Sequence, residues 1–280
     1  MAGSKGQVPG LCWGSVQGAT LLELAEVASA AGLVPLAVTP AQFADAVASG
    51  LTARDIRSRL DDLGVRVSVI DPLIRGLPGI PPAAEVLPAM RYLFEHDEED
   101  CWRAAEALEA GTINMTHFLG RPVPVEQVRD ALAEQAGRNH AHGFASTIEF
   151  IPGTMIPDLA TAADMITGSS HLRIMFDTWH FARSGGRPDD LDRLAPGAIG
   201  GGQLNDWAPP EPGAPYVPMS GRLLPGHGTL PLADIMARIE ANSPGLDICI
   251  EVFNADLAAL GRQKSVQLMA ELSAPLLASA

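Results

Sequence analysis

Lysine is almost missing from this sequence. Only Lys5, near the N-terminus, and Lys264, in the final helical segment, occur among 280 residues. Neither is placed to form a Schiff base with a carbonyl substrate at the end of a buried strand. Lysine and arginine together number 19 against 33 acidic residues, and the formal net charge is -14. This charge repels nucleic acid and anionic membranes, so we expect neither as a partner.

Cysteine is also scarce, and long apolar runs are missing. Cys12, Cys101 and Cys249 show no CxxC spacing and lie in apolar surroundings. They therefore favour a reducing compartment over a disulfide framework, and they form no zinc knuckle. No apolar run reaches the ~18 residues that a bilayer requires, and the N-terminal stretch MAGSKGQVPG lacks the apolar core of a signal peptide. We expect a soluble, cytoplasmic protein.

What the chain does have is a regular alternation of apolar, strand-like runs with segments of helical period. This alternation predicts parallel βαβ units. With 280 residues and 47% hydrophobic content, the chain has the size of one α/β barrel. We therefore predict an α/β fold, a single (β/α)8 TIM barrel that forms one domain over residues 1–280. The predicted strands are 11–13, 33–39, 65–71, 113–117, 146–150, 172–176, 199–204 and 247–252. The predicted helices are 19–32, 41–50, 52–64, 97–111, 125–143, 158–166, 189–194, 232–241 and a last one from 256 onward.

Two predicted connections are too long for ordinary barrel loops. One spans 71–90 and the other 207–222, and both are rich in proline. Each follows the C-terminal end of a strand, the face on which barrels build active sites. We interpret them as walls of a pocket. Their apolar residues suggest either a partly hydrophobic substrate or a subunit contact, so a homo-oligomer is one of two open alternatives.

Polar side chains with oxygen donors follow several of the buried runs. Carboxylates that lie side by side away from water need a positive partner, because each buried charge otherwise costs several kcal/mol. Three carboxylates and one amide favour Mg²⁺ or Mn²⁺, with Co²⁺ or Zn²⁺ also allowed. We therefore predict one divalent metal ion at the C-terminal ends of the last four strands. The four predicted ligands are Glu149, Asp177, Gln203 and Glu251.

The motifs at these strand ends resemble a known family. They are IEF, FDTWH, QLNDW, the sequence R-x-x-P-G-H-G and a closing IEVF. The chain resembles the xylose-isomerase-like barrels of the sugar isomerase and epimerase group, which includes ketose 3-epimerases, hydroxypyruvate isomerase and inosose dehydratase. The resemblance implies that Glu149 and Glu251 act as acid and base besides binding the metal. It also implies that His180 and Arg222 contact substrate oxygens.

The sequence departs from that family at Gln203, where histidine is the usual ligand. A neutral amide oxygen is a weaker and harder donor than imidazole. The departure therefore predicts a lower metal affinity and a harder metal than in relatives.

Other polar residues lie near the predicted strand ends. Asp71 and His117 end two strands at the rim of the expected pocket, and Trp13 could stack on a ring. We interpret these three as substrate contacts. Asp206 and His227 are assigned to the layer behind the site, since each also suits a solvated or capping loop position.

The preferred function is a metal-dependent isomerase or epimerase that removes a proton next to the carbonyl of a sugar or polyol. A lyase on the same site is the alternative, because β-elimination from a keto-sugar, inosose or 3-keto-glycoside begins with the same proton abstraction. A DNA-repair nuclease would need several metal-binding histidines and a basic groove, which the charge of -14 opposes. A non-catalytic binding protein is less favoured.

Overall fold

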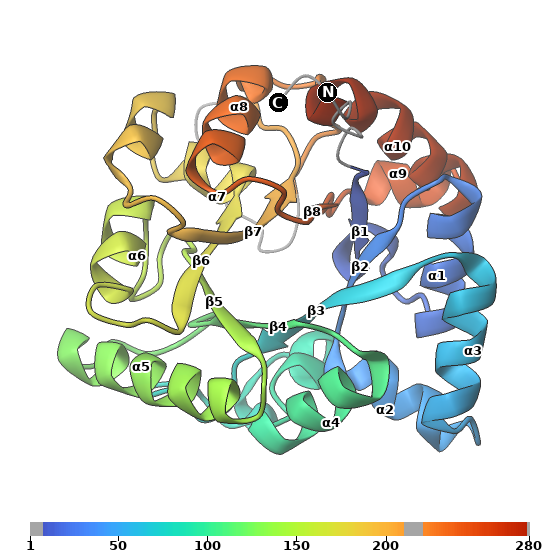
Figure 1. The fold of residues 1–280 in the computed structure, drawn as a ribbon, viewed down its shortest axis with the longest axis horizontal. Coiled ribbons are helices and arrows are strands. Elements are labelled where there is room, and N and C mark those ends of the chain that lie inside the picture. Colours follow the sequence, from blue (N-terminus) through green and yellow to red (C-terminus); the bar gives the residue numbers. More distant parts are fainter. Residues whose placement is uncertain (1–7, 210–220, 279–280) are drawn as a thin grey trace, which may run out of the picture.

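The computed structural model describes residues 8–209 and 221–278. Eight parallel strands form a closed barrel in sequence order, and the helices surround it (Figure 1). The predicted (β/α)8 barrel is thereby confirmed. The strands are β1 (Gly10–Cys12), β2 (Pro35–Val38), β3 (Arg66–Leu73), β4 (Thr112–Thr116), β5 (Ala145–Glu149), β6 (Leu172–Asp177), β7 (Ile199–Leu204) and β8 (Ile248–Ile250).

The helices begin and end where local side chains satisfy the backbone. The side chain of Thr52 accepts a hydrogen bond from the backbone of Asp55, and Gly64 ends the same helix with a φ of 69°. Both features follow from the residue types, since threonine caps N-termini and glycine tolerates the left-handed conformation. The helices are α1 (Leu21–Ala30), α2 (Pro40–Ala48), α3 (Ala53–Leu63), α4 (Glu98–Leu108), α5 (Val125–Ala141), α6 (Leu159–Met165), α7 (Thr178–Arg183), α8 (Leu232–Asn242), α9 (Ala255–Ala259) and α10 (Arg262–Ala278).

Two predicted helical segments differ in detail from the structure, and one helix was not predicted. The segment 189–194 forms a 3₁₀ helix, η4 (Pro188–Arg193), rather than an α-helix. The helix expected from residue 256 onward is divided into α9 and α10 at Gly261, whose φ is 84°. The short helix α7 directly follows β6, where the sequence suggested only a break.

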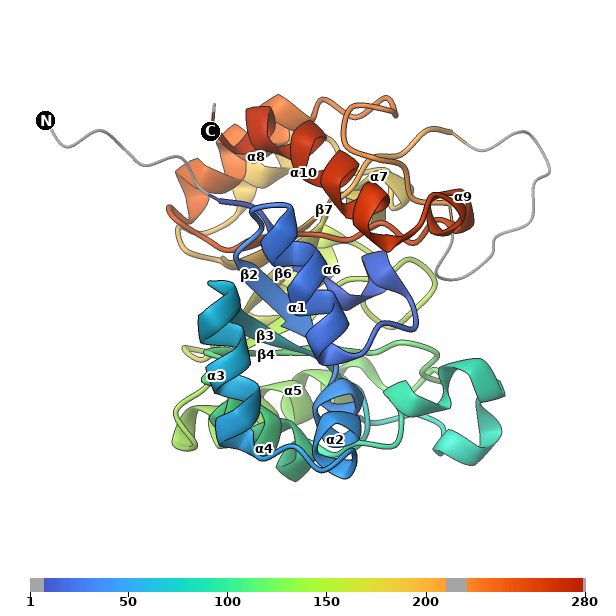
Figure 2. The same ribbon diagram turned by 90° about the vertical axis from the view of Figure 1, so that its right-hand side faces the viewer.

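The long connection between β3 and α4 projects from the barrel (Figure 2). It contains two 3₁₀ helices, η2 (Ala83–Glu85) and η3 (Pro88–Leu93). The second predicted wall, 207–222, lies mostly outside the described residues, as does Lys5. No helix in the described ranges is long and apolar enough to cross a membrane.

Candidate active site

The strands bring the predicted metal ligands to one end of the barrel. Glu149 and Asp177 are the last residues of β5 and β6, and Glu251 directly follows β8. Gln203 pairs in register with Asp177, so the two lie at the same level of neighbouring strands. All four side chains are buried, with at most 6% of their surface exposed. The register of the parallel strands thus places these four residues at the same end of the barrel. Glu149 and Glu251 line the pocket found there, whereas Asp177 and Gln203 do not.

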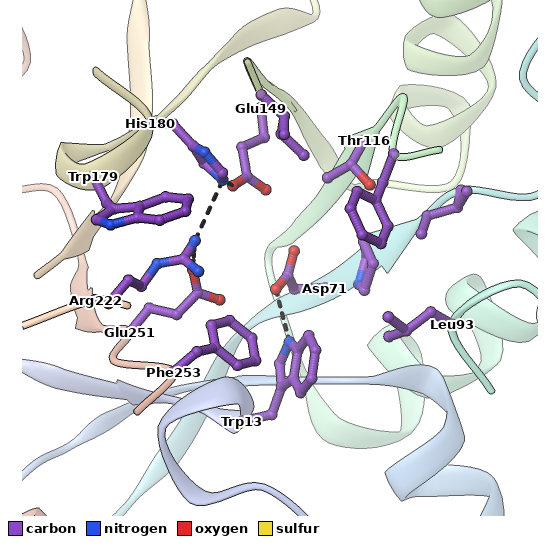
Figure 3. A pocket seen from close by; sticks show the side chains of 14 residues that line it. Trp13, Asp71, Leu93, Thr116, Glu149, Trp179, His180, Arg222, Glu251 and Phe253 are labelled. Carbon is purple, nitrogen blue, oxygen red and sulfur yellow. Dashed lines mark hydrogen bonds and ion pairs between the residues drawn. The ribbon is translucent and has the colours of Figure 1, made fainter. Parts of the chain in front are cut away.

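Arg222 places its guanidinium among these carboxylates (Figure 3). Nη2 lies 3.1 Å from Asp177 Oδ2 and 3.1 Å from Glu251 Oε2. The rings of Trp179 and Phe253 flank the guanidinium, with its carbon 4.7 Å and 4.8 Å from their centroids. Burial works against the charged form, but the carboxylates of Asp177 and Glu251 raise the pKa of Arg222 above its usual value. The arginine is therefore a permanent cation at the centre of the site.

Asp177 links this cluster to helix α7. Its Oδ1 accepts hydrogen bonds from the backbone N–H groups of Trp179 and His180, at 2.7 Å and 2.9 Å. This is an N-cap, which satisfies donors that a helix leaves unpaired at its first turn. Burial would raise the pKa of Asp177, but the adjacent Arg222 charge and the hydrogen bonds hold it at about 2. The capping carboxylate is thus ionised and fixes the two side chains that follow it.

His180 contacts both a carboxylate and the guanidinium. Its Nε2 lies 3.1 Å from Glu149 Oε1 and 3.3 Å from Arg222 Nη2. Burial lowers the pKa of His180 to about 3. The imidazole is therefore neutral near pH 7 and serves as a polar contact rather than as a second cation.

The remaining carboxyl groups hold their protons more tightly than usual. Burial raises the pKa of Glu149 well above its usual value, and the charges of Asp71 and Asp177 raise it further. Burial likewise raises the pKa of Glu251 against the lowering effect of the Arg222 charge, and the charges of Glu149 and Asp177 add to the rise. The pKa of Asp71 is also raised by burial. Perturbed carboxyl groups in a pocket are typical of acid–base sites.

The donor set suits a hard divalent cation. Gln203 Oε1 is buried and has no hydrogen-bond partner among the described residues. Donor atoms of Glu149, Asp177 and His180 lie within 4.8 Å of one another, whereas Glu251 forms a second such group with Cys12 and Asp71. Carboxylate and amide oxygens are the ligands that Mg²⁺ and Mn²⁺ prefer. Arg222 Nη2 contacts both Asp177 and Glu251, so a cation held by these two carboxylates would compete with the guanidinium.

Asp71 and Trp13 border the cluster on the side of β1 and β3. Trp13 Nε1 donates to Asp71 Oδ2 at 2.8 Å, and Asn114 Nδ2 donates to Asp71 Oδ1 at 2.7 Å. Cys12 Sγ donates to Glu251 Oε1 at 3.0 Å. Burial is the main cause that raises the pKa of the Cys12 thiol, and the charges of Glu251 and Asp71 raise it further. This side of the site is therefore held by neutral donors.

Asp206 organises the turn that follows Arg222. Its carboxylate accepts hydrogen bonds from the backbone N–H groups of Trp207, Gly226, Gly228 and Leu230. Its backbone also pairs with Leu223, the residue after Arg222. Asp206 thus supports the turn that carries Arg222 and does not itself line the pocket. His227 is exposed at the tip of this turn.

His117 lies apart from the cluster. Its Nε2 is 2.7 Å from the backbone oxygen of Pro78, in the β3–α4 connection. A Cβ on Gly120 would lie 2.0 Å from the His117 ring, so the ring packs directly against that glycine. These contacts attach the β4 end to the connection, and His117 does not line the pocket. The expected substrate contact at this residue stays a prediction without structural support.

Sequence reasoning missed two asparagines of the site. Asn205 Nδ2 donates to both oxygens of Asp177 at 3.3 Å and 3.2 Å, and to the backbone oxygen of Glu251 at 3.2 Å. Asn114 Nδ2 contacts Glu149 Oε2 at 3.3 Å. A signal was present, because Asn205 follows Gln203 by two positions and residues two apart on a strand share a face.

The carboxylate cluster opens into a pocket with an empty volume of about 510 Å³, including the space at its mouth. The cavity itself has a volume of about 60 Å³, room for a few water molecules. The polar lining residues are Asp71, Thr116, Glu149, His180, Arg222 and Glu251. The aromatic lining residues are Trp13, Phe118, Trp179 and Phe253. Aliphatic side chains of Pro72, Ile74, Leu93 and Ile151 complete the wall.

Known proteins share this architecture. The family model described as xylose isomerase-like TIM barrel matches residues 24–272. No curated protein sequence matches the chain significantly. The structure is similar to that of the IOLI protein with a bound zinc atom, with a TM-score of 0.78 and 12% identity over 97% of this chain and 98% of that one.

Two further solved structures share the fold. The D-psicose 3-epimerase solved in the presence of D-fructose gives a TM-score of 0.65 and 14% identity, and 97% of each chain is covered. The probable 3-DHS dehydratase AsbF of Bacillus anthracis gives a TM-score of 0.70 and 14% identity over 94% of this chain and 97% of that one. At such identities the likeness concerns the fold alone.

Proposed function

We propose that this chain, which belongs to the xylose isomerase-like TIM-barrel family, is a divalent-metal-dependent isomerase or epimerase. It would move a proton at the carbon next to the carbonyl group of a sugar or polyol. The observation that carries this proposal is a pair of buried glutamates with raised pKa values: Glu149, the last residue of β5, and Glu251, which directly follows β8. Two such carboxyl groups around one cavity suit the removal and return of a proton.

The positions of the two strands give each glutamate a different approach. β5 and β8 are separated by β6 and β7 on the barrel, so their side chains reach the cavity from different sides. One carboxylate removes the α-proton, and the other carboxylic acid returns a proton on the opposite face. The raised pKa values of both glutamates, caused first by burial, favour a protonated acid beside an ionised base.

Arg222 and His180 orient the substrate. The guanidinium donates to an oxygen on which negative charge develops, and the neutral imidazole contacts a neighbouring hydroxyl. A divalent cation held by Glu149, Asp177, Gln203 and Glu251 would supply Lewis-acid stabilisation of that developing charge. The ring sandwich of Trp179 and Phe253 excludes water from the guanidinium, which strengthens its interactions.

The test is exchange of the α-proton with solvent. Keto-sugars and inososes incubated in heavy water with the enzyme and Mn²⁺ should gain deuterium next to the carbonyl, and removal of the metal by a chelator should abolish the gain. Glu149→Gln and Glu251→Gln should each lower turnover by ~10² or more, the usual scale for a positioned acid or base. Glu126→Gln, at an exposed position on α5, is the matched control and should change nothing.

Full exchange in rigorously metal-free protein would refute the metal dependence. Two glutamine variants that turn over at the wild-type rate would refute the assignment of acid and base. Analysis of the product completes the test. A product of unchanged formula supports the isomerase or epimerase, whereas an unsaturated product would identify the lyase that shares the first step.

A further inference from the structure

The pocket is chemically divided into two sides. Charged groups gather on the side of β5 to β8, where Glu149, His180, Arg222 and Glu251 point toward one another (Figure 3). Asp71 lies between the two sides. The opposite side is formed by residues that follow β3, β4 and β5, and Leu93 faces the pocket there (Figure 3).

Four apolar side chains make up this opposite side, and we call them the apolar wall. They are Ile74, Leu93, Phe118 and Ile151. Ile74 is fully buried, and Leu93 and Ile151 are buried to more than nine-tenths. Phe118 packs against Phe94, with ring centroids 6.3 Å apart. The apolar wall is therefore fixed by packing and is part of the preformed pocket.

The apolar wall offers almost nothing to a hydroxyl group. Thr116 is the polar lining residue closest in sequence to it, and its Oγ1 is buried without a hydrogen-bond partner among the described residues. A free sugar carries a hydroxyl on nearly every carbon, and each hydroxyl that loses water needs a new partner. A fully hydroxylated substrate would therefore find partners at the charged side and at Thr116, and its other hydroxyls would be left unpaired against the apolar wall.

We propose that the substrate is a keto-sugar or polyol derivative with an apolar substituent, either aryl or alkyl, which binds against the apolar wall. This inference rests on the proposed function for the placement of the reacting carbonyl at the charged side. The substituent would lie among Ile74, Leu93, Phe118 and Ile151 while the α-hydroxy carbonyl unit faces Arg222 and the glutamates. The η3 segment, which supplies Leu93, thereby determines specificity.

Two keto-glycosides with the same oxidised sugar ring and either a methyl or a phenyl aglycone provide the probe. Binding to the wild-type protein with Mn²⁺ is measured by calorimetry, and kcat/KM is measured by deuterium exchange. The phenyl compound should be favoured by ~30-fold or more in both, since a buried methylene alone discriminates by ~10-fold. The ratio of the two compounds is the readout, because it does not depend on the fraction of folded protein.

Variants of one segment provide the control. Leu93→Asn should reduce the preference for the phenyl compound to a few-fold, and Leu87→Asn should keep it. Both leucines lie at the 3₁₀ helix η3, but Leu87 is 68% exposed and does not line the pocket. Phe118→Ala is a second wall variant at a half-buried position, in case Leu93→Asn does not fold.

Each outcome of these measurements either supports or overturns the inference. The inference is overturned if the wild-type protein binds the two compounds equally or binds neither of them. It is also overturned if the Leu87 and Leu93 variants lose the preference equally. Preferential binding of the phenyl compound without any deuterium exchange supports the apolar wall and refutes the proposed function instead. Exchange with both compounds at equal kcat/KM supports the function and refutes the wall.

Discussion

Arg222 supplies the positive charge that balances the carboxylates of the site. Its Nη2 contacts two of the predicted metal ligands, Asp177 and Glu251, at 3.1 Å each. A cation held by those two carboxylates would compete with this guanidinium for them.

Replacing the arginine should therefore strengthen metal binding. Arg222→Met keeps an extended side chain but removes the charge, and it should tighten Mn²⁺ by at least ~10-fold because two carboxylates lose their competing cation. Calorimetric titration of the metal-free protein measures this directly. Arg262→Met is the control, since Arg262 pairs with Glu23 on the outer helices. Unchanged or weaker binding in Arg222→Met would show that the metal does not occupy the guanidinium position.

Single residues of the site could be predicted only where a strand placed them. Glu149 and Asp177 follow buried runs, and barrel geometry alone brings such residues together. Asn205 was missed because an asparagine after a strand is equally common in turns. His117 was expected in the pocket from its strand-end position, yet its contact with Pro78 in the long connection fixes its ring elsewhere. That contact depends on tertiary packing and leaves no local signal.

At the scale of elements, the turn between β7 and α8 positions Arg222. Asp206 accepts four backbone N–H groups of this turn. Gly228 must approach it without a side chain, because a Cβ there would lie 2.3 Å from Asp206 Oδ1 and 2.4 Å from the backbone oxygen of Trp207. The turn therefore depends on this aspartate and this glycine together.

Asp206→Ala and Gly228→Ala should have the same effect. Each should lower the free energy of unfolding by about 2 kcal/mol or more, the scale expected when buried donors lose their acceptor. Each should also raise KM, because Arg222 loses its support. Urea unfolding and steady-state kinetics are the measurements. Gly137→Ala is the control, since a Cβ in that part of α5 meets no atom within 4 Å and alanine favours a helix. A stable Gly228→Ala variant would contradict this account of the turn.

The elements themselves were largely predictable from the sequence. The spacing of apolar residues and the capping residues predicted the strands and most helices, because a buried parallel strand and an amphipathic helix have distinct sequence patterns. The break between α9 and α10 and the helix α7 were not predicted. Helix α7 has six residues, which is too short for a periodic signal, and its start is fixed by Asp177.

At the scale of the whole molecule, the buried carboxyl groups couple stability to pH. Burial, together with neighbouring charges, raises the pKa of Glu149, Glu251 and Asp71. A carboxyl group with a raised pKa in the folded state stabilises the protein below its unfolded pKa of about 4, and this contribution is lost as the pH rises through the folded value. Asp177, with a pKa of about 2, acts in the opposite sense and loses its contribution only as the pH falls toward that value.

The melting temperature of the metal-free protein should therefore fall as the pH rises from about 5 to about 8. Saturating Mn²⁺ should reduce this fall and raise the melting temperature more at pH 8 than at pH 5, because a metal binds the deprotonated carboxylates. Scanning calorimetry with chelator or with Mn²⁺ measures both curves. Two parallel curves would mean that these carboxyl groups do not bind the cation.

Asp177 joins folding and the candidate chemistry in one side chain, and this limits how the protein can change by mutation. One of its oxygens starts helix α7, and the other contacts Arg222. A library randomised at this position would lose the helix start and the charged contact together, so selection for heat resistance and selection for new reactivity must both retain it. The apolar wall has no such double role. Adaptation to new substrates should therefore accumulate in the loops after β3, β4 and β5, while the β6 end stays fixed.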